Sequence, residues 1–346
     1  MDLESAQLIR RTLQGDRVAL ARAISWVENE APAAKELLDA FFERSGRARR
    51  LGITGPPGAG KSTLVTRLTQ EYRRRGLTVG VVAVDPTSPF SGGAMLGDRV
   101  RMGELAGDAG VFIRSMATRG SLGGVAVHTA QVCDVLDAAG FERILVETVG
   151  VGQSELEIAQ TADSTAVVLV PESGDAVQAM KAGLMEIGDL FVINKADREG
   201  AERGAFAVRS ALELRAAMSD WDPPVLLTIA VQGIGVTEVA NEFESHLAYL
   251  ESHGGLDRRR RQRLEQRVVS VLRDQVWETT RASVPDRAWA EVIDSVVERR
   301  RSPHQAAETL LAAGRLPGSN DGDQAGRPGP APAGAARTSV PIKAVR

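Results

Sequence analysis

A glycine-rich stretch near residue 55 is the part of this chain best suited to chemistry on phosphate groups. Residues 55–62 fit the pattern G-x-x-x-x-G-K-[S/T]. Glycines let backbone N–H groups approach the α- and β-phosphates without Cβ clashes, and a helix N-terminus behind them adds positive charge. Lys61 would reach the β- and γ-phosphates, and the Ser62 hydroxyl would bind Mg²⁺. We therefore predict a nucleoside triphosphate site formed by Gly55, Pro56, Pro57, Gly58, Ala59, Gly60, Lys61, Ser62 and Thr63.

A second motif predicts which base is bound. An apolar strand at 189–193 runs into Asn194-Lys195-Ala196-Asp197, where sheets of the α/β class place their ligands. The Asp197 carboxylate can accept hydrogen bonds from guanine N1–H and from its exocyclic amino group. Adenine has no N1–H, so it would leave that carboxylate unpaired. Lys195 would lie along the base and Asn194 would brace the neighbouring loops, so we predict GTP.

A third segment, 143–150, ends an apolar strand with an acid and a glycine. Glu147 can hold a magnesium-bound water, and the Gly150 N–H can contact the γ-phosphate, so the loop would change shape when that phosphate leaves. In fast small GTPases a glutamine follows this glycine and orients the attacking water. Here Val151 follows it, and Gln153 is the nearest glutamine and the candidate catalytic side chain. We predict slow intrinsic hydrolysis that a partner can modulate.

Two aspartates between these motifs are candidates for magnesium or its waters. Asp85 ends the β-branched run 79–86, and Asp98 closes the glycine-rich segment that follows. Mg²⁺ prefers oxygen ligands and keeps several waters, which carboxylates at this position could hold. Each aspartate alone is more often a turn or cap residue. The pair, together with Ser62 and Glu147, makes up the predicted magnesium site.

The motifs together resemble one family. GPPGAGKST, VDPTSPFSGGAMLGDRVRM, RGSLGG, ETVGVGQSE and NKAD are similar to the MeaB/ArgK family of GTPases associated with methylmalonyl-CoA mutase, over about residues 15–307. The resemblance implies a SIMIBI-class GTPase, dimeric, that chaperones an adenosylcobalamin-dependent acyl-CoA mutase. GTP binding and hydrolysis would gate cofactor loading and help to protect or rescue the mutase. It also implies phosphate and magnesium roles for Lys61, Ser62, Asp85, Asp98 and Glu147, and guanine contacts for Asn194, Lys195 and Asp197.

The sequence departs from such GTPases at one position. They usually carry a Ser-Ala-x signature whose alanine N–H meets guanine O6, whereas this chain reads Ile229-Ala230-Val231. Ala230 keeps the backbone donor. A backbone contact tolerates the changed side chain, so guanine binding is expected to survive in weaker form, with Ile229, Ala230 and Val231 as candidate contacts.

The elements that must position these residues predict an α/β fold. Apolar strands alternate with helical patterns, which favours a mostly parallel, doubly wound P-loop GTPase sheet with helical extensions at both ends. We expect a helical extension at 1–48, the GTPase domain at 49–250, a helical dimerisation arm at 256–315 and a disordered tail at 316–346.

Composition narrows the function classes. The net charge of -3 gives no electrostatic footprint for nucleic acid. No apolar run approaches a membrane span and the N-terminus lacks signal-peptide features, so a cytoplasmic location is expected. The single Cys133 reads as a buried helix position. The arginine cluster at 258–263 reads as a solvated helix face, with RNA or an acidic partner as the alternative.

Three other classes of function stay open at this point. One is a GTP- or ATP-dependent kinase linked to a periplasmic basic-amino-acid transport system. Another is a metal-delivery GTPase, which would need a Cys/His cluster, whereas the four histidines and the lone cysteine are scattered along the chain. The third is a purely scaffolding protein, whose affinity for a partner would not change with the bound nucleotide. Which acyl-CoA mutase would be the partner does not follow from the sequence.

Overall fold

The computed structural model describes residues 2–86, 103–105, 107–118, 124–148, 158–171, 183–213 and 221–314. Several predicted positions lie outside these ranges: Asp98, Gly150, Val151, Gln153 and the tail 316–346. By compactness the chain divides into two units, residues 1–274 and 275–346. No helix in the described part is both long and apolar enough to cross a membrane.

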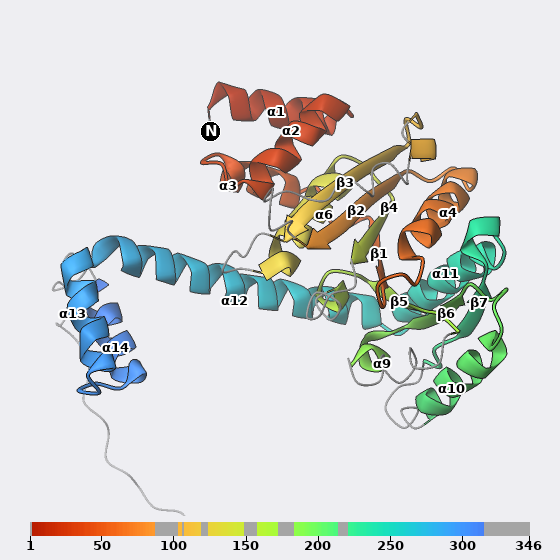
Figure 1. Ribbon diagram of the computed structural model, residues 1–346. Helices are drawn as coiled ribbons and strands as arrows, with labels where there is room; N and C mark the ends of the chain where they lie inside the picture. The colour runs from red at the N-terminus through yellow and green to blue at the C-terminus, as the bar shows by residue number, and fades with distance from the viewer. Residues whose placement is uncertain are drawn as a thin grey trace, which may run out of the picture. The chain divides into compact units, whose positions relative to one another are not determined.

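The first unit is built on a seven-stranded sheet in the order β3-β2-β4-β1-β5-β6-β7, and every pairing is parallel (Figure 1). The sheet confirms the predicted doubly wound α/β fold. β4, β5 and β6 are buried along almost their whole length, as expected of parallel strands covered on both faces. The strands are β1 (Arg49–Thr54), β2 (Val79–Pro86), β3 (Val111–Thr118), β4 (Arg143–Thr148), β5 (Ser164–Leu169), β6 (Leu190–Asn194) and β7 (Val225–Thr228).

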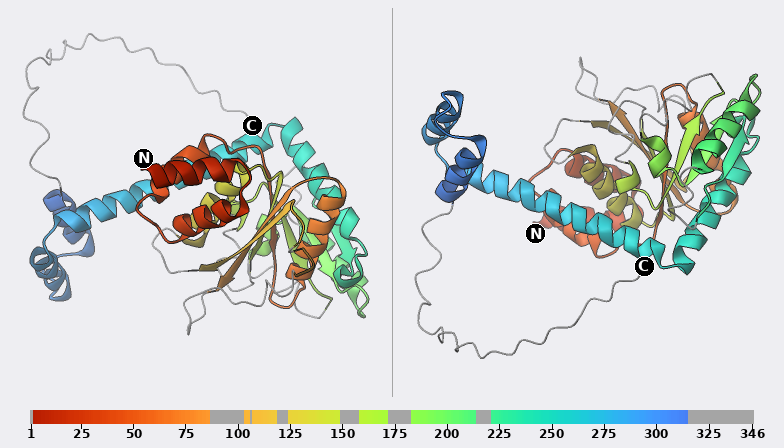
Figure 2. Two further views of the ribbon diagram at one scale, coloured as in Figure 1. Left: turned by 90° about the horizontal axis from the view of Figure 1, so that it is seen from above. Right: turned by 90° about the horizontal axis from the view of Figure 1, so that it is seen from below.

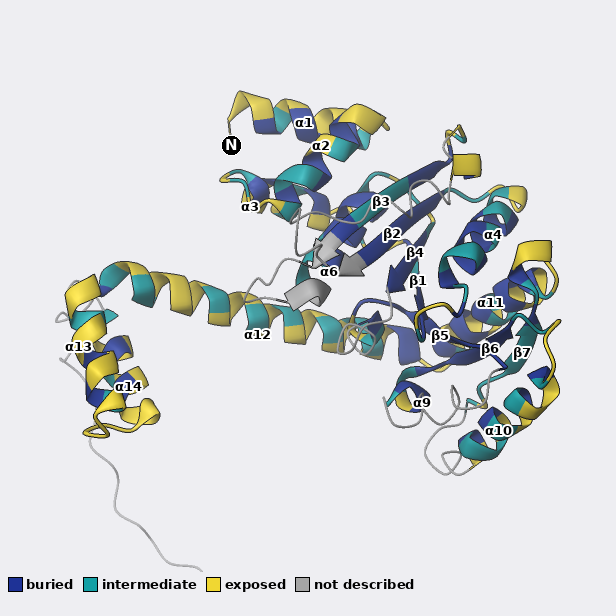
Figure 3. Cartoon of the chain, in the orientation of Figure 1, coloured by how far each residue is buried: buried dark blue, intermediate teal, exposed yellow. Residues whose placement is uncertain are grey.

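Alternate side chains of β2 to β7 enter different hydrophobic cores on the two faces of the sheet. One face packs against α4 (Lys61–Arg74) and α11 (Val236–Ser252). The other packs against α6 (Gly124–Ala138), α9 (Leu184–Ile187) and α10 (Ala201–Glu213). Figure 2 shows the two helix layers on opposite sides of the strands, and Figure 3 shows the dark, buried sheet between them.

Three N-terminal helices add to the layer over α6: α1 (Leu3–Leu13), α2 (Arg17–Glu28) and α3 (Ala34–Phe42). Two of them begin with aspartate caps: Asp2 accepts from the Ser5 N–H, and Asp16 accepts from Val18 and Ala19. Cys133 is fully buried in α6, as predicted, and burial raises the pKa of its thiol to about 12.

The first turns of α12 (Gly255–Ser283) correct one expectation about the arginine cluster. Arg259 pairs with Asp189 at 2.8 Å and Arg260 pairs with Asp163 at 2.9 Å. Arg263 also reaches Asp163, whose side chain is 0% exposed. A solvated face is therefore wrong for these three arginines, although Arg261 is exposed and pairs only with Glu265, four residues on.

The carboxylate of Asp163 is the centre of this arrangement. It accepts from the Arg50 N–H at 3.0 Å as well as from the two arginines of α12. Burial alone would raise the pKa of Asp163, but the hydrogen bonds and charges of Arg260 and Arg263 outweigh it and hold that pKa well below its usual range. We call this set, Asp163 with Arg260 and Arg263, the arginine clamp.

The second unit continues α12 beyond residue 274 and adds α13 (Asp286–Val297) and α14 (Pro303–Gly314). A small core holds them together, made of Val284, Val292, Ala306 and Leu310. Trp277 and Trp289 meet edge to face, with ring centroids 5.5 Å apart. Other large apolar side chains of α12 are exposed, Val276 in this unit and, in the first unit, Leu264, Val268, Val269, Val271 and Leu272.

Candidate nucleotide-binding site

The glycine-rich loop lies between β1 and α4, at the centre of the sheet. β1 pairs with β4 on one side and β5 on the other, so the strand order reverses there. Ligands of open α/β sheets bind at such a switch point, beyond the carboxyl ends of the strands. The predicted loop therefore occupies the position that its function requires.

Two glycines of the loop cannot be replaced without a clash. Gly55 has φ +136°, and a Cβ there would lie 2.0 Å from the Val168 carbonyl oxygen. Gly60 has φ +90°, and a Cβ there would lie 2.3 Å from Asn194 Nδ2. The backbone thus approaches β5 and the Asn194 side chain as closely as glycine allows.

Lys61 begins α4 and folds back over the loop. Its Nζ donates to the carbonyl oxygens of Gly55, at 2.7 Å, and Pro56, at 3.0 Å. The ammonium group therefore lies directly against the loop that would hold the phosphates.

The Ser62 hydroxyl donates to Glu147 Oε1 across 2.6 Å, at the end of β4. Glu147 is 1% exposed, and it lies level with Ile53 on the neighbouring strand. These are hard oxygen donors side by side, so the pair fits Mg²⁺. Asp85 comes near the end of β2, one residue beyond Val84, which is level with Thr148; only its backbone is described.

The Asn194 side chain contacts the glycine-rich loop, the end of β7 and the turn after it. Its Nδ2 donates to the Ala59 carbonyl in the glycine-rich loop at 2.8 Å. Its Oδ1 accepts from Thr228 Oγ1 and from the Ala230 N–H, both at 3.1 Å. The glycine-rich loop and the turn after β7 are therefore held through one buried amide.

The remaining guanine candidates lie in the turns after β6 and β7. Lys195, at φ +58°, donates from Nζ to the Gly58 carbonyl at 2.7 Å, and Asp197 is exposed in the turn after β6. The Ala230 N–H expected at guanine O6 donates instead to Asn194, while Val231 is exposed beside it and Ile229 donates to Ile234.

Two supporting residues were missed from the sequence. Arg67 of α4 donates to the Val231 carbonyl at 3.0 Å and so holds the turn after β7. Thr228 donates to Asn194, as described above. Neither has a local motif, because each acts on a residue distant in sequence. Within the described ranges, no group of three or more His, Cys, Asp or Glu side chains is arranged to hold a metal ion.

Comparisons with protein families, with related proteins and with solved structures find similar proteins. The family model described as "Methylmalonyl Co-A mutase-associated GTPase MeaB" matches residues 20–284. A protein of Pyrococcus abyssi that bears the name of a GTPase is 47% identical over 308 residues, 88% of this chain and 95% of that protein. The GTPase ArgK of Escherichia coli is 40% identical over 281 residues, 79% of this chain and 84% of ArgK. A crystal structure described as an LAO/AO transport system kinase superposes with TM-score 0.68 at 30% identity, covering 90% of this chain and 98% of that one.

Proposed function

Because the chain belongs to the MeaB family of methylmalonyl-CoA mutase-associated GTPases, we propose that its GTPase activity serves an adenosylcobalamin-dependent acyl-CoA mutase in the cytoplasm. The chain would bind the mutase, gate the loading of its cofactor, and protect or reactivate it. The observation that carries the nucleotide part of the proposal is the Asn194 amide, which ties the phosphate loop to the turn expected at the guanine base.

In the proposed reaction, water attacks the γ-phosphate in line with the departing GDP. Lys61 would exchange its loop carbonyls for β- and γ-phosphate oxygens, and the loop N–H groups would donate to the same phosphates. Asp197 would accept from guanine, and the base would rest along Lys195. Gln153, outside the described residues, would help to orient the water.

The pair of Ser62 and Glu147 supports a magnesium site, to which we add Asp85 and Asp98 as candidates. When bound there, Mg²⁺ would neutralise charge on the phosphate oxygens. Ser62 would turn its hydroxyl oxygen toward the ion, and Glu147 would hold the ion or one of its waters. Loss of the γ-phosphate would then release the segments that contain Asp98 and Gly150, and those segments would report the nucleotide state to the mutase.

We also propose that residues 256–315 form the dimerisation arm. The exposed apolar side chains of α12 support this, because a solvent-facing row of large apolar groups is stabilised when a second surface covers it. A second copy of the chain is the occupant that the family resemblance implies.

Affinity capture tests the partner. The full chain is loaded with GDP or with a non-hydrolysable GTP analogue and used to capture proteins from native lysate, which mass spectrometry identifies. We expect an adenosylcobalamin-dependent acyl-CoA mutase to be enriched in one nucleotide state over the other. The mutase assignment fails if neither state enriches a cobalamin enzyme, whereas GTP hydrolysis measured separately would stand.

The kinase described for the structural neighbour gives a competing outcome. GTP labelled at the γ-phosphate distinguishes the two, because a GTPase transfers the label to water and a kinase transfers it to a protein. Label appearing on an acceptor protein faster than inorganic phosphate is released would favour the kinase.

A further inference from the structure

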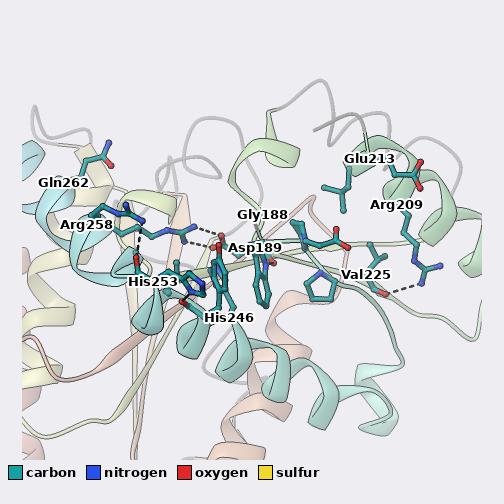
Figure 4. A pocket seen from close by; sticks show the side chains of 18 residues that line it. Gly188, Asp189, Arg209, Glu213, Val225, His246, His253, Arg258 and Gln262 are labelled. Atoms are coloured by element: carbon teal, nitrogen blue, oxygen red, sulfur yellow. Dashed lines mark hydrogen bonds and ion pairs between the residues drawn. The ribbon is translucent and has the colours of Figure 1, made fainter. Parts of the chain in front are cut away.

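A cavity lies at the amino end of β6, whereas the nucleotide site lies at its carboxyl end. Gly188 and Asp189, which precede β6, line it, whereas Asn194 of the nucleotide site ends the same strand. Its walls come from α10, from residues 221–225, from the end of α11 and from the first turns of α12 (Figure 4). Its volume is about 810 Å³, within the range of small-molecule sites.

Aromatic rings form one wall of this cavity. Trp221 lies 4.7 Å from His246 and 5.1 Å from Tyr249, and Tyr249 lies 4.4 Å from His253, measured between ring centroids. The indole of Trp221 is fixed by a hydrogen bond from Nε1 to the Asp189 carbonyl at 2.9 Å. A wall of fixed rings favours a flat ligand, because stacking costs little side-chain entropy when the rings are already ordered.

Two of the charged side chains that line the cavity neutralise each other. The Asp189 carboxylate accepts two hydrogen bonds from Arg259, at 2.8 and 2.9 Å, so the pair is neutral overall. Burial lowers the pKa of His246 to about 4, although the charge of Asp189 acts to raise it, so the imidazole is neutral near pH 7. The ring wall is therefore suited to an uncharged ring.

Four further charged side chains line the cavity: Arg258, Arg209, Glu213 and Asp222. Arg258, exposed on the first turn of α12, lines the cavity, and its guanidinium is 3.5 Å from the His253 carbonyl, at the limit of a hydrogen bond. Figure 4 shows Arg258 and Gln262 together at one end of the cavity, away from Glu213 and Arg209. The neighbouring acid Asp257 does not line the cavity.

We propose that this cavity is a second ligand site, which takes a planar aromatic ring bearing one anionic group. The ring would stack against Trp221 and Tyr249, and the anion would pair with the guanidinium of Arg258, with Gln262 as a further donor. The site is independent of the nucleotide site, because the two lie at opposite ends of β6.

Calorimetric titration of the full-length protein with 2-naphthoate tests the proposal. The protein is saturated with GDP so that the phosphate loop is occupied. We expect one saturable site per chain, weakened at least tenfold by Arg258→Gln and, separately, by Tyr249→Leu. The neutral analogue 2-naphthalenemethanol should bind at least tenfold more weakly than 2-naphthoate to the wild-type protein.

Arg261→Gln is the matched control, because Arg261 lies on the same helix, is exposed, and does not line the cavity. It should leave the titration unchanged, and GTP hydrolysis should be the same in all variants. Absence of saturable binding, or binding that persists in both Arg258→Gln and Tyr249→Leu, would overturn the proposal. Because Arg258 is on the surface, its variant remains informative even if Tyr249→Leu fails to fold.

Discussion

At the scale of single residues, Asn194 connects the two halves of the nucleotide site through one side chain. Asn194→Ala would leave the Ala59 carbonyl and the Ala230 N–H without this partner. An unpaired buried polar group costs about 1–3 kcal/mol. We therefore expect the affinity for GTP to fall by about 10- to 100-fold, measured by titration calorimetry.

Asn194→Asp tests the donor of the amide separately from its acceptor. It keeps an oxygen for Thr228 and Ala230 but replaces the donor to the Ala59 carbonyl with a second acceptor. It should therefore weaken GTP binding as well. If Asn194→Ala binds GTP within twofold of the wild-type protein, the bracing role is wrong.

The sequence predicted those site residues that form contiguous motifs, and it missed those that act across the fold. The glycine-rich loop and Asn194 could be found because spacing and chemistry are local. Arg67 could not be found, because its partner is the Val231 carbonyl, brought beside α4 only when the turn after β7 packs there. A backbone acceptor leaves no trace in the sequence at either position.

At the scale of elements, the arginine clamp holds the first turns of α12 against the sheet. Arg263→Met would remove a cation beside a carboxylate that is 0% exposed. Asp163 would keep Arg260 as a partner, so the cost is that of losing charge-assisted hydrogen bonds, about 1.5–3 kcal/mol. We expect a loss of that order in the free energy of unfolding, measured by urea denaturation.

Arg261→Met, two residues away on the same helix, is the matched control. Its side chain is 84% exposed, so its pair with Glu265 contributes less than about 1 kcal/mol. Equal losses in the two variants would contradict the clamp. The run of arginines indicated a solvated face, since Asp163 and Asp189 lie far away in the sequence and only the folded chain brings them together.

At the scale of the whole molecule, the proposed dimer depends on the exposed apolar side chains of α12. Val268 is 66% exposed, so Val268→Asp should not disturb the core of the chain. In a dimer it would bury a charge, so we expect a shift from dimer to monomer in light scattering after size exclusion. Leu3→Asp, at a position 91% exposed on α1, is the control and should leave the mass unchanged. If the wild-type protein is already a monomer, the proposal that this arm mediates a dimer is wrong.

The arginine clamp, together with the pair of Arg259 and Asp189, also fixes the rotation of α12 about its axis. Successive residues of a helix are turned by about 100°, so one residue inserted between Leu256 and Arg259 would swing the three paired guanidinium groups away from their carboxylates. Two apolar surfaces can pack in several rotations, whereas a buried carboxylate is neutralised only in the helix rotation that brings the arginines beside it. Insertions and deletions are therefore better tolerated in the loops than in the first turn of α12. Fusions or insertions meant to preserve the protein should be placed in the loops.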